Sequence, residues 1–176
     1  MRDQGGLCAY CTRRVDVNGG HVEHIIPQSE GKGGDDPNSV DYRNMLAVCD
    51  GFEGDQAGLT CDRARGSRPL AINPLDAAQV DCITYRHDGT IGSVDASICD
   101  CLNKTLNLNQ EMLKRNRRAA LDASNKLLER RGRRGPKVVV AYCKRYVEEH
   151  LARPEERQPY DGIVVYFMRR RIRAGS

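Results

Sequence analysis

Four cysteines in the first third of the chain have the spacing of a structural zinc site. Cys8 and Cys11 form a Cys-x2-Cys pair in a glycine-flanked turn, and this spacing lets two thiolates approach one tetrahedral ion. Cys49 and Cys61 stand beside turn-forming sequence and are the best candidates for the other two ligands, with the eleven residues between them looped out. The alternative is a redox pair, which needs a strand before the two cysteines and a helix after them; the sequence that follows does not start a helix.

The other cysteines are expected to lie outside that site. They are Cys82, Cys99, Cys101 and Cys143. The N-terminus lacks the apolar core of a signal peptide, so we expect a reducing, cytoplasmic compartment, in which a disulfide framework is the weaker explanation. These four residues are therefore interpreted as reduced, partly buried thiols.

A second group of residues, between the cysteine pairs, has the chemistry to hydrolyse a phosphodiester. The segment His21-Val-Glu23-His24 is short and β-branched, which predicts a strand with His21 and Glu23 on one face and His24 on the other. Asn44 follows twenty residues after His24, and Asp62 stands at the start of an expected helical turn. A neutral imidazole near pH 7 can act as a general base, and carboxylate oxygens suit Mg²⁺ or Mn²⁺. Each residue alone has an ordinary structural explanation; the combination carries the signal.

The order Cys-x2-Cys, Glu-His, Asn, Cys and Cys-Asp resembles the HNH, or ββα-metal, nuclease family, in which a four-cysteine zinc site often clamps the ββα unit. The resemblance implies that His24 is the general base and that Glu23 and Asp62 hold the catalytic Mg²⁺ or Mn²⁺. It also implies that Asn44 braces the loop and orients His24. Many relatives have His or Asn in the place of Asp62. For His21 two interpretations stay open: contact with metal or phosphate, or a plain strand position.

Four short motifs narrow the resemblance: His-Val-Glu-His-Ile-x-Pro, Asn44-Met-Leu-Ala-x-Cys-Asp, Cys61-Asp-x-x-x-Gly66 and Leu106-Asn-Leu-Asn109. Together they are similar to the HNH proteins of Septu-type and retron-associated anti-phage systems (PtuB-like), over roughly residues 5–130. Members of that prokaryotic group work beside an ABC-type ATPase, so the resemblance implies such a partner. They usually carry a segment before the first cysteine pair, where this chain has seven residues.

Short elements are expected to position the site. The first strand ends at Pro27, a polar, glycine-rich loop runs over residues 28–41, and Leu46 and Val48 indicate a second strand. A helical turn after Cys61 is expected to stop at Gly66. Beyond it, residues 80–94 have the pattern of a β-hairpin with an Asp-Gly turn.

The C-terminal part is expected to be helical. Asn107 with Gln110 fits a capping box, and Leu113, Ala120 and Leu127 recur at seven-residue spacing, which predicts an apolar face on a helix of about 24 residues. A second helix is expected over residues 137–153. The apolar stretch 160–167 fits either a strand or a helix.

Charge is distributed unevenly along the chain. Residues 1–100 carry 9 Lys/Arg and 16 Asp/Glu, a net charge of −7, whereas residues 101–176 carry 19 and 8, a net charge of +11. A basic half of this kind suits the phosphate backbone of nucleic acid or an acidic protein partner, and we favour nucleic acid, with DNA first. The candidate contacts are His21, Arg63, Arg65, Arg68, Arg117 and Arg118.

We therefore predict an α+β protein with three regions. They are a zinc-stapled ββα-metal (HNH/His-Me finger) core at residues 1–70, a β-hairpin extension at 71–101 and a basic helical region at 102–176. No apolar run is long enough to span a membrane. The predicted function is metal-dependent endonuclease cleavage, with DNA as the favoured substrate, within an anti-phage system. The alternative is a non-catalytic zinc-ribbon module that binds nucleic acid, or a scaffolding subunit. Nothing in the sequence indicates an oligomeric state.

Overall fold

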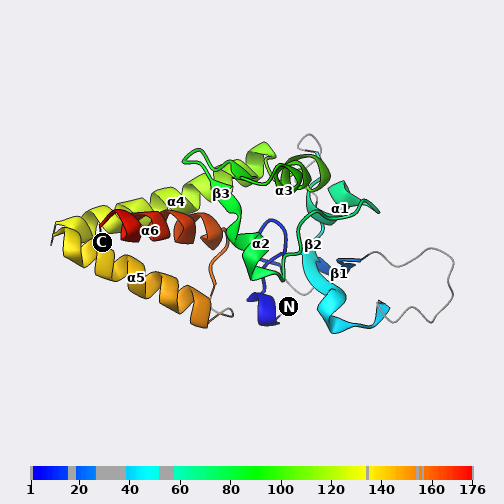
Figure 1. Cartoon of the computed structure of the whole chain (residues 1–176), viewed down its shortest axis with the longest axis horizontal. Helices are drawn as coiled ribbons and strands as arrows, with labels where there is room; N and C mark the ends of the chain where they lie inside the picture. Colours follow the sequence, from blue (N-terminus) through cyan, green and yellow to red (C-terminus); the bar gives the residue numbers. More distant parts are fainter. Residues whose placement is uncertain are drawn as a thin grey trace.

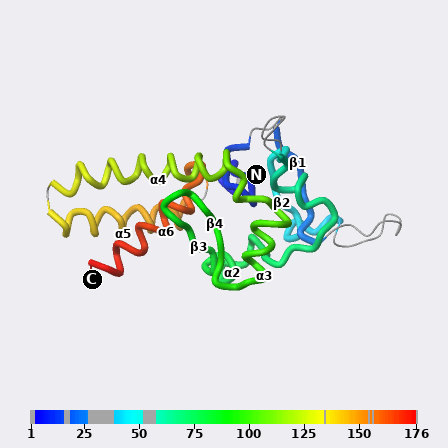
Figure 2. Tube along the Cα trace, turned by 90° about the horizontal axis from the view of Figure 1, so that it is seen from above, coloured from blue at the N-terminus to red at the C-terminus, as the bar shows by residue number. Residues whose placement is uncertain are grey.

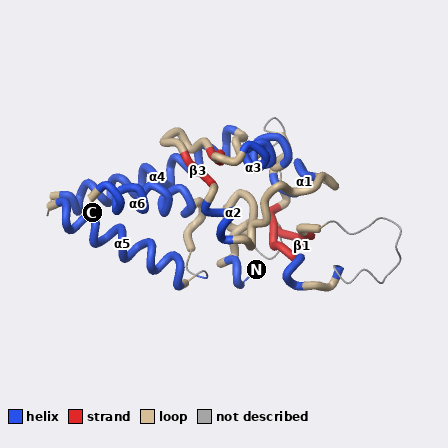
Figure 3. Tube along the Cα trace, in the orientation of Figure 1, coloured by secondary structure: helices blue, strands red, loops and turns tan. Residues whose placement is uncertain are grey.

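The computed structural model describes residues 2–15, 19–26, 39–51, 58–133, 135–153, 155 and 157–175. Over these ranges it is an α+β structure with two two-stranded sheets and six α-helices. Short strands and short helices between residues 2 and 105 make up one part of the molecule, which we call the front part. Three long helices extend from it to one side (Figures 1 and 3). The predicted α+β class is thereby confirmed.

The front part begins with an antiparallel hairpin and the short helix that follows it in the chain. The bounds are η1 (Arg2–Gln4), β1 (Gly20–His24), η3 (Tyr42–Asn44), β2 (Met45–Cys49) and α1 (Cys61–Arg65). The two strands and the helical turn ending at Gly66 are as predicted, and Gly66 has the positive φ (+55°) that favours glycine. Pro27 and most of the predicted polar loop, up to residue 38, lie outside the described residues.

A second hairpin and three short helical segments complete the front part. They are α2 (Ala77–Asp81), β3 (Ile83–Tyr85), β4 (Ile91–Ser93), α3 (Ala96–Asp100) and the π-helix η4 (Cys101–Thr105). The predicted hairpin is confirmed, but its first strand is shorter than expected. The Asp76 carboxylate accepts hydrogen bonds from the N–H groups of Ala78 and Gln79, and the helix that this cap starts includes Val80 and Asp81, the first two residues predicted to be strand.

Three helices, α4 (Glu111–Gly132), α5 (Pro136–Ala152) and α6 (Asp161–Ala174), form a bundle. The end of α4, the start of α5 and the C-terminus of the chain lie together at the far end of it (Figures 1 and 2). The apolar stretch 160–167 is therefore helical. The cap of α4 differs from the prediction: Gln110 accepts from the N–H groups of Met112 and Leu113, whereas Asn107 has a φ of +49° and lies outside the helix.

The helices bury a different stripe of α4 from the one expected. Leu113 is buried in the front core, but Leu121 and Leu128 are the next buried leucines, and Leu127 is 37% exposed. The shift arises because Leu113 packs against the front part, whereas Leu121 and Leu128 pack against α5 and α6 on another side of the helix. One repeat therefore could not describe both contacts.

The segment Leu106-Asn-Leu-Asn109 joins the front part to the bundle. Leu106 and Leu108 are both 1% exposed in the front core, which also includes Cys8 and Leu113. The Asn109 amide accepts from the N–H of Ile91 (2.9 Å) and donates to its carbonyl (2.8 Å). This core therefore runs through all three regions predicted from the sequence.

A polar group that the sequence did not indicate holds α5 against α6. The buried Asp161 carboxylate accepts from the Tyr146 hydroxyl and lies 2.7 Å from Nδ1 of His150. At the same end of α6, the N–H of Tyr160 donates to the carbonyl of Thr12 (3.1 Å), and the Asn116 amide donates to the Tyr160 hydroxyl (3.0 Å). The start of α6 is thus tied to the first cysteine turn. Among the described helices, none is both long enough and apolar enough to cross a membrane.

Arg117, which we expected to contact nucleic acid, is instead a buried structural residue. It is 3% exposed, and its guanidinium donates to the carbonyls of Gly89 and Leu108, each at 2.6 Å. The neighbouring Arg118 is on the surface and lies 3.7 Å from Asp122. The prediction for Arg117 was therefore wrong, because folding buries this side chain against the backbone carbonyls of Gly89 and Leu108.

Replacing Arg117 with Met should lower the free energy of unfolding by about 2–4 kcal/mol, because two buried carbonyls lose their donors. Replacing Arg118 with Met should change it by less than about 0.5 kcal/mol, since an exposed ion pair contributes little. Urea denaturation of both variants checks this, and equal effects at the two positions would contradict the internal role of Arg117.

Candidate functional site

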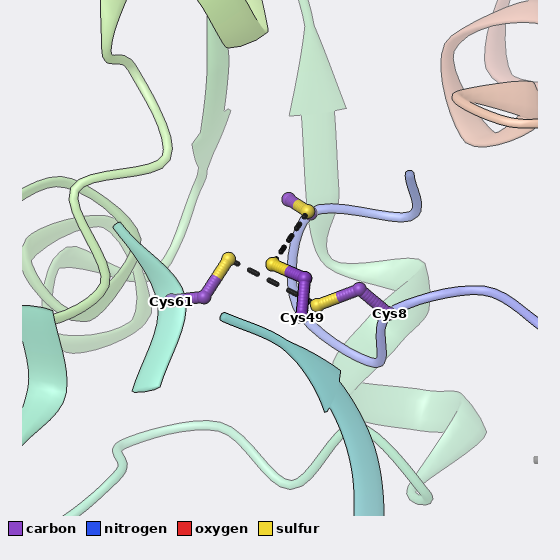
Figure 4. A group of neighbouring side chains, drawn as sticks. Cys8, Cys49 and Cys61 are labelled. Carbon is purple, nitrogen blue, oxygen red and sulfur yellow. Dashed lines mark hydrogen bonds between the residues drawn. The ribbon is translucent and has the colours of Figure 1, made fainter. Parts of the chain in front are cut away.

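The four cysteines expected to bind zinc lie together in the front part (Figure 4). Cys8 and Cys61 have their sulfur atoms 3.9 Å apart, and Cys11 and Cys49 have theirs 3.8 Å apart. A tetrahedral site with Zn–S bonds of about 2.3 Å has sulfur–sulfur edges of about 3.8 Å. All four side chains are buried, and none forms a disulfide. The geometry therefore fits a closed structural zinc site.

A tight turn presents the first two cysteines. The N–H of Cys8 donates to the carbonyl of Arg13 (2.9 Å), and the N–H of Thr12 donates to that of Cys8 (3.0 Å). The N–H of Ala9 donates to the carbonyl of Ala47 (3.0 Å), which fastens the turn to β2. Because Cys49 is the last residue of β2, this contact sets the turn beside the third ligand.

A close backbone approach brings the third and fourth cysteines together. The N–H of Thr60 donates to the carbonyl of Gly51 (2.9 Å), and Cys61, the first residue of α1, donates its N–H to the carbonyl of Leu106 (2.9 Å). Gly51 has a φ of +63°, and a Cβ on it would lie 2.2 Å from the carbonyl oxygen of Thr60. Only glycine fits there without a backbone shift.

The acid–base chemistry of the cluster also fits a cation. Hydrogen bonds from the neighbouring thiols lower the pKa of Cys8, and the largest effect comes from Cys11. Hydrogen bonds with the same group of thiols raise the pKa of Cys61, and the largest effect again comes from Cys11. One or two thiolates are thus stabilised by the remaining S–H groups, but four adjacent thiolates repel one another. A divalent ion removes that conflict, so the donor set and its burial suit Zn²⁺.

The predicted acidic pair comes from β1 and α1. His21 and Glu23 share a face of β1, as expected from strand alternation. Nε2 of His21 lies 2.6 Å from Oδ2 of Asp62. Burial first, and then the adjacent Asp62 carboxyl, raise the pKa of Glu23.

His24 faces away from this acidic pair. Its Nε2 lies 3.2 Å from the carbonyl oxygen of Ser39. Asn44 is 5% exposed and holds the chain just beyond: its side chain accepts from the N–H of Ile26 (2.8 Å) and donates to the Ile26 carbonyl (3.1 Å). The structure therefore joins Glu23 to Asp62 and places His24 next to the segment that Asn44 braces.

Arg65 has a structural position that the sequence did not reveal. It is 2% exposed, and its guanidinium forms an ion pair with Glu23. It also donates to the carbonyls of His24 (2.7 Å) and Ile25 (2.8 Å). The expectation that Arg65 contacts nucleic acid does not fit this burial. No sequence signal could have found these bonds, because three of the five acceptors of Arg65 are backbone carbonyls and the other two are the Tyr10 hydroxyl and the Glu23 carboxylate.

The other expected nucleic-acid contacts have varied surroundings. Arg63 is exposed on α1, and His21 has a side chain that is 41% exposed. Arg68 is also exposed, but its guanidinium donates to the carbonyls of Lys104 and Thr105, both at 2.9 Å. Arg68 therefore ties α1 to the π-helix η4.

Within the described ranges, one group of three or more His, Cys, Asp or Glu residues has potential ligand atoms that all lie within 4.8 Å of one another, and this group is the cysteine cluster. His21, Glu23 and Asp62 make pairwise contacts instead. Any cation at these residues would be held by few protein oxygens and several waters, as Mg²⁺ commonly is.

Comparison with known proteins gave no match to a family model, to a curated protein or to a solved structure.

The cysteine cluster should bind one zinc ion per chain, measured by elemental analysis of the purified protein. Cys49→Ser should lose that zinc and unfold at a lower temperature, because the remaining thiols cannot close the site. Cys82→Ser is the matched control, since Cys82 lies outside the cluster, and it should keep the metal. Full zinc content in Cys49→Ser would contradict the assignment.

Gly51→Ala should lower the free energy of unfolding by at least about 2 kcal/mol, because the new Cβ meets the Thr60 carbonyl and the φ is positive. Gly66→Ala is the control for positive φ alone: its φ is +55°, and a Cβ there meets nothing within 4 Å. It should cost about 1 kcal/mol. Thermal unfolding of the two variants measures the difference, and equal losses would show that the close approach is unimportant.

Proposed function

We propose that the chain is a metal-dependent endonuclease of the HNH type that cleaves nucleic acid, with DNA as the favoured substrate. The observation that carries the proposal is the pairing of Glu23 on β1 with Asp62 on α1, beside a buried four-cysteine cluster. The helix α1 follows the hairpin β1–β2, and the clustered cysteines lie before the hairpin, at its end and at the start of the helix, which agrees with the motif order behind the sequence resemblance. Two interacting carboxyls at the surface of such a unit can share one hard divalent cation.

The carboxyls of Glu23 and Asp62 would hold Mg²⁺ or Mn²⁺. When bound, such an ion neutralises charge on the phosphoryl and leaving oxygens of a phosphodiester. A carboxylate can only accept a hydrogen bond, so Nε2 of His21 donates to Asp62. This hydrogen bond orients the Asp62 carboxylate. His21 thus acts as a positioning residue for Asp62.

His24 would be the general base, and its hydrogen bond assigns the nitrogen that takes the proton. The carbonyl of Ser39 can only accept, so Nε2 of His24 carries a hydrogen. In the neutral ring Nδ1 is then left as the acceptor that can remove a proton from water. Asn44 supports this arrangement by fixing the backbone of Ile26.

The biological setting is proposed from the sequence motifs. Their similarity to the HNH proteins of Septu-type and retron-associated systems supports an anti-phage role beside an ABC-type ATPase partner. Sequence-tolerant binding to phosphate would leave the choice of target to that partner.

One observation favours a second candidate, a non-catalytic zinc module or scaffolding subunit. The buried Arg65 already supplies Glu23 with a positive charge, so this carboxylate has a partner without any metal. On this second candidate the acidic pair only stabilises the contact between β1 and α1.

A nuclease assay tests the first candidate, with supercoiled plasmid, linear DNA and RNA in Mg²⁺ or Mn²⁺. Asp62→Ala and His24→Ala should each reduce cleavage by at least about 100-fold, since one removes a cation ligand and the other removes the base. The matched control is Asp100→Ala, at a surface acid paired with Lys104, which should cleave like the unmodified protein.

Calorimetric titration with Mn²⁺ separates the two candidates if no cleavage is seen. Binding that Asp62→Ala abolishes supports the nuclease with its partner absent. No Mn²⁺ binding, or binding that the variant retains, would favour the non-catalytic candidate.

A further inference from the structure

The far end of the bundle collects basic side chains from all three of its helices. We call this surface the bundle tip and define it by Arg130, Arg133, Lys137, Arg170, Arg171 and Arg173, all of them exposed. The helices meet there: Gly132 lies beside Val139, Gly175 lies beside Val140, and Arg171 donates to the Asn125 side chain (3.4 Å). Figures 1 and 2 both show the end of α4, the start of α5 and the end of α6 together.

Few acidic groups balance this charge. Glu129 is the one acid between residues 123 and 147, and there is none after Asp161. Across the part of the chain that the structure describes, no ion pair joins any of the six side chains to a carboxylate. Like charges gathered in this way repel one another, and a polyanion laid across them would remove that repulsion.

The candidate cleavage site has the opposite electrostatic character. Residues 1–100 carry a net charge of −7, and four thiolates outweigh the charge of one Zn²⁺, so the loaded front part is more negative still. A phosphate backbone is therefore repelled by the half of the chain that would cut it. The affinity for such a substrate has to come from elsewhere on the molecule.

We propose that the bundle tip binds the phosphate backbone of duplex DNA and holds it for the front part. This inference rests on the proposed function, since the DNA is the substrate of that site. Five of the six side chains are arginines, which form paired hydrogen bonds to phosphate. Arg170 is already stacked near the rings of Tyr166 and Phe167, about 6 Å away, which limits its freedom before binding.

The length of α4 sets the size of substrate. Its 22 residues span about 33 Å between the front part and the tip. Each base pair adds about 3.4 Å along the axis of duplex DNA, so a duplex needs roughly 10 base pairs to reach from the front part to the tip. Duplex DNA is stiff over this length and can bridge the two without bending. Substrates much shorter than this should be cut poorly.

Fluorescence anisotropy with a 30-base-pair duplex tests the proposal, in buffer without added Mg²⁺ or Mn²⁺. The tip variant carries Arg130→Glu, Arg133→Glu and Arg173→Glu. It should bind at least about 10-fold more weakly, and the slope of log affinity against log salt should fall by about 3, close to one unit per lost phosphate contact. The control variant carries Arg86→Glu, Lys104→Glu and Lys144→Glu, which makes the same change in net charge at exposed positions away from the tip. It should lose less than about threefold.

Two results of the binding assay would overturn the inference. Equal losses in the two variants would mean that only net charge matters, and unchanged binding by the tip variant would leave its charge for an acidic protein. Circular dichroism of both variants verifies that they fold. Binding through the tip by an unmodified protein that neither cleaves DNA nor binds Mn²⁺ would support the DNA-binding tip and reject the nuclease. Metal-dependent cleavage with unchanged binding by the tip variant would do the reverse.

Discussion

The front part depends on four thiols that come from three separate segments of the chain. A two-stranded hairpin such as β1–β2 is marginally stable alone, and a five-residue helix such as α1 has no independent stability. Cys8 and Cys11 lie on a turn, Cys49 ends the hairpin, and Cys61 begins α1. One ion shared by these sulfurs would therefore fasten elements that cannot bury enough apolar surface by themselves. The positions of Glu23 and Asp62 follow from this fastening, because one acid belongs to the hairpin and the other to the helix.

Buried polar groups extend that arrangement beyond the metal site. Arg65 joins α1 to the end of β1 through Glu23 and two carbonyls, and Arg117 joins α4 to the second hairpin and to Leu108. Asn109 pairs with both backbone groups of Ile91. In each case a charged or amide side chain satisfies backbone groups that would otherwise be buried without partners. The Leu-Asn-Leu-Asn motif, singled out from sequence, thus has a clear structural use as a connector.

Local patterns predicted the elements that local forces determine. The cysteine spacing, the alternation of His21 and Glu23, the stop at Gly66 and the Asp-Gly hairpin are all set by neighbours a few residues away. Predictions were wrong where a second local signal or a distant contact decided. Asp76 capped a helix that extends into the first two residues of the predicted hairpin, Val80 and Asp81.

Distant contacts account for the remaining differences. The sequence does not show that Arg65 and Arg117 are buried, because most of their partners are carbonyls brought close only by folding. The same is true of Asp161 with Tyr146 and His150, which are linked through two helices. The catalytic roles of His24, Glu23, Asn44 and Asp62 stay predictions from motif order, to which the structure adds the pairing of the two acids.

The hydrogen bond from the N–H of Tyr160 to the carbonyl of Thr12 brings the start of α6 into contact with the first cysteine turn, which also contacts β2. The same turn that presents two sulfurs to the ion also receives the start of α6, and Tyr160 in turn accepts from Asn116 on α4. Zinc bound by the four cysteines would therefore also stabilise the start of α6. Loss of that ion would loosen the attachment of the basic helices as well as the hairpin, so a shortage of zinc would impair both ends of the protein.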